Sequence, residues 1–178
     1  MRVVGGLYRH RILEWPDDDK NIRPTKDRIR EAIFSSLGDL TNKNVLDLYS
    51  GSGAMGIEAL SRNAKFATFV DNNKVALTTT KNNIKSLNIN SAEVISGDDF
   101  NVLESFKDNK QFDLIILDPP YQKGRYIELL DFIITNNIVS NFGIFVIESQ
   151  SSLDYEKYNF SKIKRFHYGE INVDILYL

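Results

Sequence analysis

The chain has 178 residues, of which 42% are hydrophobic and 26% charged, as is typical of a globular protein with one domain-sized core. It contains no cysteine, which excludes a disulfide framework, a thiolate zinc site and a cysteine nucleophile. The longest apolar runs, such as residues 114–117, are far too short to cross a bilayer, and no signal peptide is recognisable at the start. We expect a soluble, cytoplasmic and monomeric protein without a membrane partner.

Charge is distributed unevenly along the chain. The net charge is −2, but residues 1–30 hold eight Lys or Arg against five Asp or Glu, whereas residues 31–178 hold fourteen against nineteen. A basic segment on an acidic body is compatible with a polyanionic partner at that end, although the charge pattern alone favours an ordinary solvated surface.

The first forty residues predict an extension rather than an independent domain. Residues 2–14 place β-forming side chains around a Gly-Gly pair, which predicts two short strands about a turn. Residues 23–38 have the apolar spacing of an amphipathic helix. We therefore expect a hairpin and a helix over 1–40 that depend on a larger domain spanning 41–178.

Strands and helices alternate from residue 44 onward. Strands that are apolar throughout are typical of a parallel sheet covered on both faces, and the alternation predicts a doubly wound α/β domain. Two final apolar runs without a helix between them predict an antiparallel hairpin. The predicted strands are 44–49, 66–71, 92–97, 112–118, 143–149, 161–169 and 171–178, and the predicted helices are 54–62, 74–88, 99–107 and 125–136.

A glycine-rich loop follows the first predicted parallel strand. Residues 51–56 read Gly-Ser-Gly-Ala-Met-Gly and match G-x-G-x-x-G, a loop in which glycines and a helix N-terminus admit a nucleotide. Asp71 ends the next strand, twenty residues after Gly51, where a carboxylate can accept both hydroxyls of a ribose. The pattern predicts an adenosine-type ligand, and both hydride transfer with NAD and methyl transfer with S-adenosylmethionine remain open.

Acidic residues around this loop favour the second chemistry. Asp47 lies just upstream of the glycines, where a carboxylate repels a pyrophosphate but attracts the ammonium and sulfonium groups of S-adenosylmethionine. Asp98 and Asp99 follow the third strand, where Asp98 can accept from the adenine amine and Asp99 can cap the next helix. The expected cofactor-binding residues are Asp47, Tyr49, Ser50, Gly51, Gly53, Asp71, Asn72, Asp98, Asp99 and Asp118.

The sequence Asp118-Pro119-Pro120-Tyr121 ends the fourth predicted strand and decides between the two chemistries. The prolines have no N–H, so the groups exposed there are acceptors, namely the Asp118 carboxylate and the Pro119 carbonyl. They suit an exocyclic base amine, and Tyr121 offers a face for stacking a base that has left its helix. We expect Asp118, Pro119 and Tyr121 to be catalytic, with no histidine base, because the amine becomes acidic once it is methylated.

With these motifs the chain resembles the class I S-adenosylmethionine-dependent methyltransferases, and more narrowly the RsmD-type 16S rRNA guanine-N2 methyltransferases. The resemblance implies a seven-stranded Rossmann-like sheet with the last strand antiparallel, and S-adenosylmethionine converted to S-adenosylhomocysteine without a metal. It also implies a substrate guanine, guanine 966 in rRNA numbering, within small ribosomal subunit particles. The segments that carry it are 1–13, 23–37, 45–62, 69–73, 82–89, 112–121 and the terminal hairpin.

The basic side chains expected near the RNA are Arg9, Arg11, Arg23, Lys26, Arg30, Lys123 and Arg125. The D-P-P-Y segment fits any planar exocyclic amine, so methylation of adenine N6 in DNA or RNA remains an alternative. A non-catalytic RNA-binding or ribosome-assembly module is an alternative of another class, and an NAD-dependent oxidoreductase is a third. Label transfer from S-adenosylmethionine to unmethylated small subunits, with base analysis of the product, distinguishes them.

Overall fold

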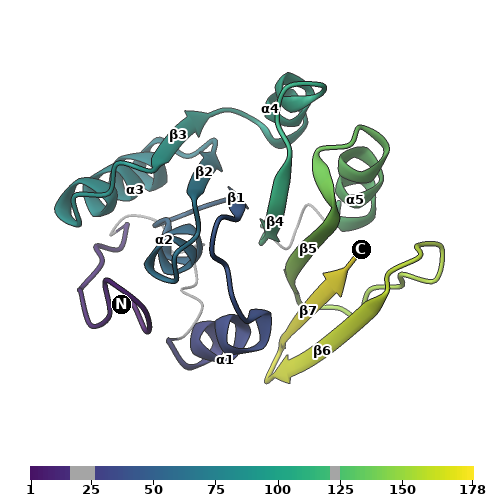
Figure 1. Ribbon diagram of the computed structural model, residues 1–178, viewed down its shortest axis with the longest axis horizontal. Coiled ribbons are helices and arrows are strands. Elements are labelled where there is room, and N and C mark those ends of the chain that lie inside the picture. Colours follow the sequence, from purple (N-terminus) through teal and green to yellow (C-terminus); the bar gives the residue numbers. More distant parts are fainter. Residues whose placement is uncertain (17–26, 121–124) are drawn as a thin grey trace.

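The computed structural model describes residues 1–16, 27–120 and 125–178, and within these residues one seven-stranded mixed sheet forms the centre of the molecule (Figure 1). The strand order is β3-β2-β1-β4-β5-β7-β6. The first five strands are parallel, and β7 is antiparallel to both of its neighbours, as predicted. The strands are β1 (Asn44–Leu48), β2 (Phe66–Asp71), β3 (Ala92–Ser96), β4 (Phe112–Leu117), β5 (Val139–Ser149), β6 (Lys162–Tyr168) and β7 (Ile171–Tyr177).

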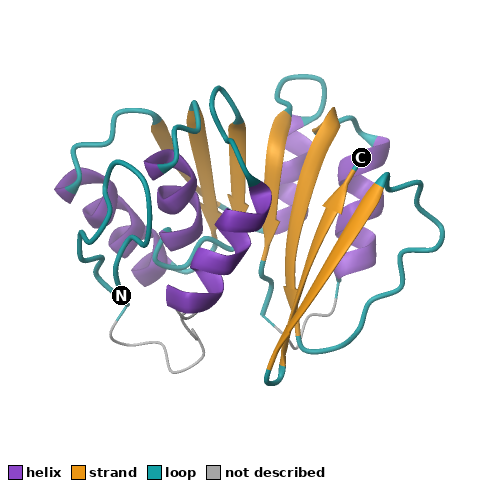
Figure 2. Cartoon of the chain, turned by 60° about the horizontal axis from the view of Figure 1, so that its bottom comes forward, coloured by secondary structure: helices purple, strands orange, loops and turns teal. Residues whose placement is uncertain are grey.

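Helices cover both faces of this sheet (Figure 2), which explains why its central strands are apolar on both sides. In β1, for example, Val45 belongs to the core beneath α1 and α2, whereas Leu46 belongs to the opposite core beneath α4 and α5. No described helix has the length and apolar character needed to span a membrane. The helices are α1 (Asp27–Leu37), α2 (Ala54–Ser61), α3 (Lys74–Ser86), α4 (Asp99–Phe106) and α5 (Tyr126–Thr135).

The predicted N-terminal hairpin is present as one antiparallel bridge, between Arg2 and Ile12. Val3 is also hydrogen-bonded across the segment, to Arg11 and His10, but the amides of Val4 and Leu7 face α2 instead. The amide of Val4 donates to the Glu58 carboxylate at 2.8 Å, and the amide of Leu7 donates to the Ser61 carbonyl at 2.7 Å. The segment is thus held against α2 by hydrogen bonds that a regular two-stranded ladder would have used.

The largest boundary difference from the sequence prediction lies in β5. Strand β5 begins at Val139, four residues before the predicted start, and its register with β4 shifts between Phe112 and Leu114. Polar residues and the 84% exposed Phe142 lie in this irregular stretch, so the alternation that marks a strand is lost there. Helix α1 is described from Asp27 onward, and its predicted start at residue 23 lies outside the described residues.

Candidate functional site

Four acidic side chains gather where the parallel strands end. Asp47 and Asp71 lie near the carboxyl ends of β1 and β2, Asp118 directly follows β4, and Glu148 lies near the end of β5. Across neighbouring strands, Val70 of β2 pairs with Leu48 of β1, Leu48 with Leu117 of β4, and Leu117 with Ile147 of β5. Each of the four acids is next to one of these residues in sequence, so the acids lie side by side along one edge. Each is also two residues beyond a side chain in the core beneath α1 and α2, so all four share that face of the sheet.

The glycine loop joins this edge to α2 through an unusual backbone. Tyr49, Gly51 and Gly53 all have positive φ angles, of 71°, 54° and 77°. The Gly53 amide donates to the Ser50 carbonyl at 2.7 Å, which closes the turn. The third glycine serves packing instead, because a Cβ at Gly56 would lie 2.3 Å from the Phe69 ring. The loop therefore brings backbone N–H groups to the carboxyl edge of the sheet.

Asp47 is 3% exposed and accepts a hydrogen bond from the Gly56 amide at 2.8 Å. Burial raises the pKa of this carboxyl to about 7, the Gly56 hydrogen bond opposes the rise, and the charge of Asp71 adds to it. A carboxylate that is this costly to ionise would be stabilised by a cation beside it. This is the property expected of an acid that receives a positively charged ligand.

Asp71 ties the glycine loop to the loop after β2. Its two carboxylate oxygens accept from the amides of Gly51 and Asn73, each at 2.9 Å. Asn72 donates to Asp98 at 3.0 Å, which links the ends of β2 and β3. A small crevice lies between these loops, lined by Leu48, Tyr49, Val70, Asp71, Asn72, Gly97, Asp98 and Asp99. The structure thus brings together the residues predicted to hold an adenosine.

Asp98, not Asp99, occupies the N-cap position of α4, which corrects the predicted cap. Asp99 is the first helical residue and is buried. One of its oxygens accepts from the Tyr49 hydroxyl at 2.5 Å and from the Arg125 guanidinium at 2.6 Å. Asp99 and Arg125 therefore neutralise each other beneath the crevice, and Arg125, predicted to contact RNA, is committed to this pair.

Asp118 and Glu148 form the second half of the acidic edge. Burial raises the pKa of Asp118 well above its ordinary value, and the charges of Glu148 and Asp47 raise it further. The hydroxyl of Tyr126 is buried without a hydrogen-bond partner among the described residues. Burial, Asp118 and Glu148 raise the pKa of this hydroxyl to about 12, which places it beside the two acids. Pro119 is buried next to Asp118, and Tyr121 lies outside the described residues.

Glu148 was not predicted from the sequence, although a signal for it existed. It is 6% exposed and follows an apolar run, Phe145-Val146-Ile147, just as the other three acids follow theirs. The Ser50 hydroxyl, which was predicted, is likewise buried and has no hydrogen-bond partner among the described residues. No group of three described His, Cys, Asp or Glu residues is arranged to hold a metal ion.

Two of the exposed basic residues predicted to bind RNA lie away from this edge. Arg9 and Arg11 are exposed, but their segment docks on the last residues of α2 and α3, and Arg11 donates to the Ser86 carbonyl at 3.1 Å. Both helices begin at the acidic edge, where the parallel strands end. The last residues of these helices therefore lie at the opposite edge, where the parallel strands begin. Arg23, Lys26 and Lys123 lie outside the described residues.

The assignment of Arg30 to RNA binding is wrong, because its side chain is fully buried. It pairs with Asp27 at 2.9 Å and with Glu58 at 3.7 Å, and it donates to the Arg2 carbonyl. From sequence alone, an arginine in the middle of an amphipathic helix is expected to lie on the exposed face. Here the buried Glu58 of α2 supplies its countercharge, so Arg30 joins α1, α2 and the N-terminal segment.

Comparisons with known proteins agree with this arrangement. A family model described as conserved hypothetical protein 95 matches residues 1–177. The ribosomal RNA small subunit methyltransferase D of Escherichia coli K12 is 30% identical over 151 residues, which are 84% of this chain and 75% of that protein. The protein of the same name from Buchnera aphidicola of Acyrthosiphon pisum is 38% identical over 123 residues, which are 68% of this chain and 63%, less than two thirds, of that relative.

The fold is also shared with solved structures. A structure described as the putative methyltransferase yhhF from Escherichia coli superposes with a TM-score of 0.89 at 27% sequence identity, covering 99% of this chain and 97% of that one. This likeness and the strand order confirm the predicted Rossmann-like fold of the class I methyltransferases.

Proposed function

Because the chain belongs to the RsmD-type methyltransferase family, we propose that it transfers a methyl group from S-adenosylmethionine to the N2 amine of a guanine in small-subunit rRNA. The observation that carries this proposal is the row of four acids, Asp71, Asp47, Asp118 and Glu148, on one face of the carboxyl edge. Two of them lie beside the glycine loop, and the other two lie at the ends of β4 and β5. The row therefore offers a place for a cationic cofactor next to a place for a base rich in donors.

The residues at the first half of the row fit S-adenosylmethionine. The buried Asp47 would gain from the ammonium and sulfonium charges, whereas a pyrophosphate near it would be repelled. The buried Ser50 hydroxyl is available as a further polar contact. Asp71 would accept from the ribose and Asp98 from the adenine amine. S-adenosylmethionine supplies a methyl group on a positively charged sulfur, and the chain's part is to orient it.

The second half of the row fits guanine better than adenine. The Watson–Crick edge of guanine presents N1–H and the N2 amine as adjacent donors, which match a pair of carboxylates. Adenine presents its amine beside N1, an acceptor that a carboxylate repels. We assign Asp118 and the Pro119 carbonyl to the N2 amine and Glu148 to the N1–H. Glu148 thus favours guanine over the alternative, adenine N6.

The same acids account for the chemistry. The lone pair of N2 is delocalised into the ring, and acceptors at Asp118 and Pro119 favour the pyramidal nitrogen that forms in the transition state. The methylated nitrogen is cationic and must lose a proton. Asp118, whose pKa is raised by burial and by its acidic neighbours, is suited to take that proton. No histidine is required.

The test is incubation of the protein with labelled S-adenosylmethionine and unmethylated small ribosomal subunits, followed by nucleoside analysis. We expect N2-methylguanosine from the wild-type protein, and from D118A a loss of transfer while calorimetry still detects cofactor binding. E104A, which removes an exposed carboxylate on α4, is the matched control and should retain both. Near-normal turnover by D118A would contradict the assigned chemistry.

A further inference from the structure

We propose that the end of the β6–β7 hairpin is an RNA-docking surface that holds the nucleotides flanking the target guanine. The surface consists of Arg165, His167 and Asn172 on one face of the hairpin and Phe166 and Tyr168 on the other. This inference rests on the proposed function, and it adds RNA contacts near the acidic edge, from which the exposed Arg9 and Arg11 are distant.

Sheet register places this surface beside the catalytic acids. Glu148 pairs with Val173 of β7, and Val173 pairs with Phe166 of β6, so Phe166 lies on the same face as Glu148. Two strand spacings separate them, or about 10 Å. The turn of the hairpin lies at the carboxyl end of β5 and projects beyond the neighbouring strands (Figure 2). RNA bound at Glu148 would therefore meet the hairpin first on this side of the site.

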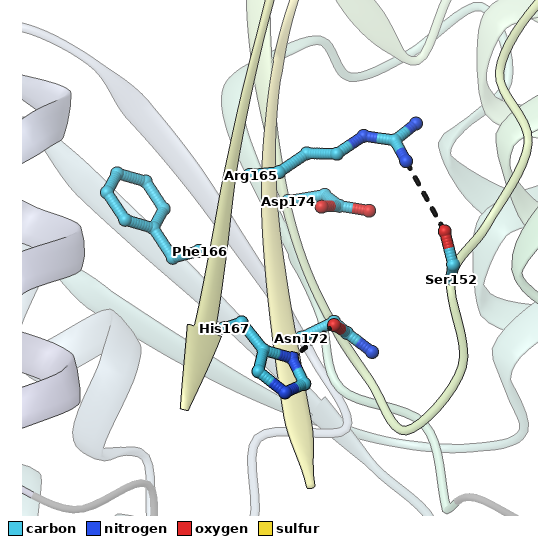
Figure 3. Close-up of a pocket in the computed structure, with 6 residues that line it drawn as sticks. All are labelled: Ser152, Arg165, Phe166, His167, Asn172 and Asp174. Atoms are coloured by element: carbon cyan, nitrogen blue, oxygen red, sulfur yellow. Dashed lines mark hydrogen bonds between the residues drawn. The ribbon is translucent and has the colours of Figure 1, made fainter. Parts of the chain in front are cut away.

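The basic face of the hairpin forms a pocket of about 90 Å³ (Figure 3). Arg165 extends across it, donating weakly to the Ser152 hydroxyl at 3.4 Å and to the Leu153 carbonyl at 3.2 Å. The Nδ1 atom of His167 lies 2.9 Å from the Asn172 side-chain oxygen, which orients the exposed ring and leaves Nε2 for another partner. Guanidinium, imidazole and amide groups together are the donors that bind a backbone phosphate.

One carboxylate lines the same pocket but does not fill it. Asp174 is 3% exposed, and its Oδ2 atom accepts from the hydroxyl of Tyr155 at 2.9 Å. It therefore lies at the base of the pocket, whereas Arg165 and His167 are exposed at its rim. A phosphate entering from solvent would meet the two basic side chains before it met the acid.

The other face of the hairpin is aromatic. Phe166 points away from Arg165 and His167 (Figure 3), and its ring is stacked with that of Tyr168, with centroids 6.4 Å apart and planes 11° apart. Both rings are half-buried, so each keeps surface in contact with solvent. Because β6 is the edge strand, only its narrow open edge separates the aromatic face from the basic face. One nucleotide could place its base on the rings and its phosphate at the pocket.

The polar residues of β6 are not explained by a need to protect the edge strand from pairing with another chain. Lysines on an edge strand hinder pairing with another chain, and the exposed Lys162 fits that role. Lys164 is turned inward, donating to the Ser36 carbonyl and hydroxyl at 2.8 Å. Arg165 and His167 instead converge on a concave site, on the face opposite Glu148 but at the same end of the sheet.

The experiment compares R165A/H167A with wild type and with R9A, an exposed arginine at the opposite edge of the sheet. Binding to unmethylated small subunits is measured by co-sedimentation over a range of salt concentrations. We expect the double variant to bind roughly tenfold more weakly, with a salt slope shallower by about 1 to 2. F166L, which keeps the apolar volume, should weaken binding a few-fold without changing the slope.

The cofactor affinity and the single-turnover rate at saturating subunits should match wild type in all three variants, since none of these residues touches the cofactor or the reacting atoms. Wild-type binding by R165A/H167A would overturn the docking surface. Weaker binding with an unchanged salt slope would overturn the RNA assignment in favour of a ribosomal protein. Binding is read without methyl transfer, so a wild-type protein that binds but does not methylate would refute the proposed function alone.

Discussion

Replacing Asp47 by Asn should stabilise the cofactor-free protein at neutral pH while weakening its cofactor site. Asparagine has nearly the same shape, and its amide oxygen can still accept from the Gly56 amide, the one hydrogen bond that this carboxylate accepts from the described residues. What the substitution removes is a buried negative charge close to Asp71 and Asp118. The effect should therefore depend on pH in a defined window.

The magnitude follows from the difference between the two pKa values. The pKa of Asp47 rises from 3.8 to about 7 on folding, because burial outweighs the Gly56 hydrogen bond. Below the unfolded value both states hold the proton, and between the two values only the folded state does. Folding stability is therefore lost as pH rises through this window, to a total of about 4 kcal/mol for a shift of about 3 pH units. D47N should be free of this loss.

The assay is urea unfolding of wild type and D47N from pH 4 to pH 8. The difference between their unfolding free energies should grow in favour of D47N by up to about 4 kcal/mol across that range and level off near pH 8. Calorimetry at pH 8 should show weaker binding of S-adenosylmethionine by the variant. A difference that stays constant with pH, or one that grows in favour of wild type, would refute the reasoning about Asp47.

Two further substitutions probe the loop and the base site. G56A should lower the unfolding free energy by about 1–3 kcal/mol in urea titrations, because the new Cβ would lie 2.3 Å from the Phe69 ring; an unchanged midpoint would mean that the ring moves away freely. E148Q should lower kcat/KM for small subunits roughly 10- to 100-fold with unchanged cofactor affinity, since a neutral amide replaces the charged acceptor assigned to guanine N1–H; unaltered kinetics would exclude that assignment.

Much of the fold followed from local patterns. The parallel strands are continuous apolar runs, and Asp47, Asp71 and Asp118 each follow apolar residues of such a run and lie near a recognisable motif, so they could be identified without a structure. The glycine loop was recognisable because its spacing reflects a backbone requirement that the positive φ angles of Gly51 and Gly53 display.

The features that sequence reasoning missed depend on partners far along the chain. Arg30 is buried because Glu58, twenty-eight residues later, meets it across two helices. The N-terminal hairpin is limited to a bridge and the hydrogen bonds next to it, because the amides of Leu7 and Tyr8 donate to Ser61 of α2. Glu148 can be recognised as a site residue only when β5 is known to pair with β4, because this pairing places it next to Asp118. Periodicity describes one segment at a time and contains no such information.

Delivery of a methyl group to guanine N2 at the acidic edge is tested by identifying the methylated nucleoside. Unmethylated small ribosomal subunits are incubated with the protein and labelled S-adenosylmethionine, and the labelled nucleoside is identified after digestion of the rRNA. We predict a single labelled product, N2-methylguanosine, that is absent with D118A. Label in N6-methyladenosine, or no label in the rRNA, would contradict it.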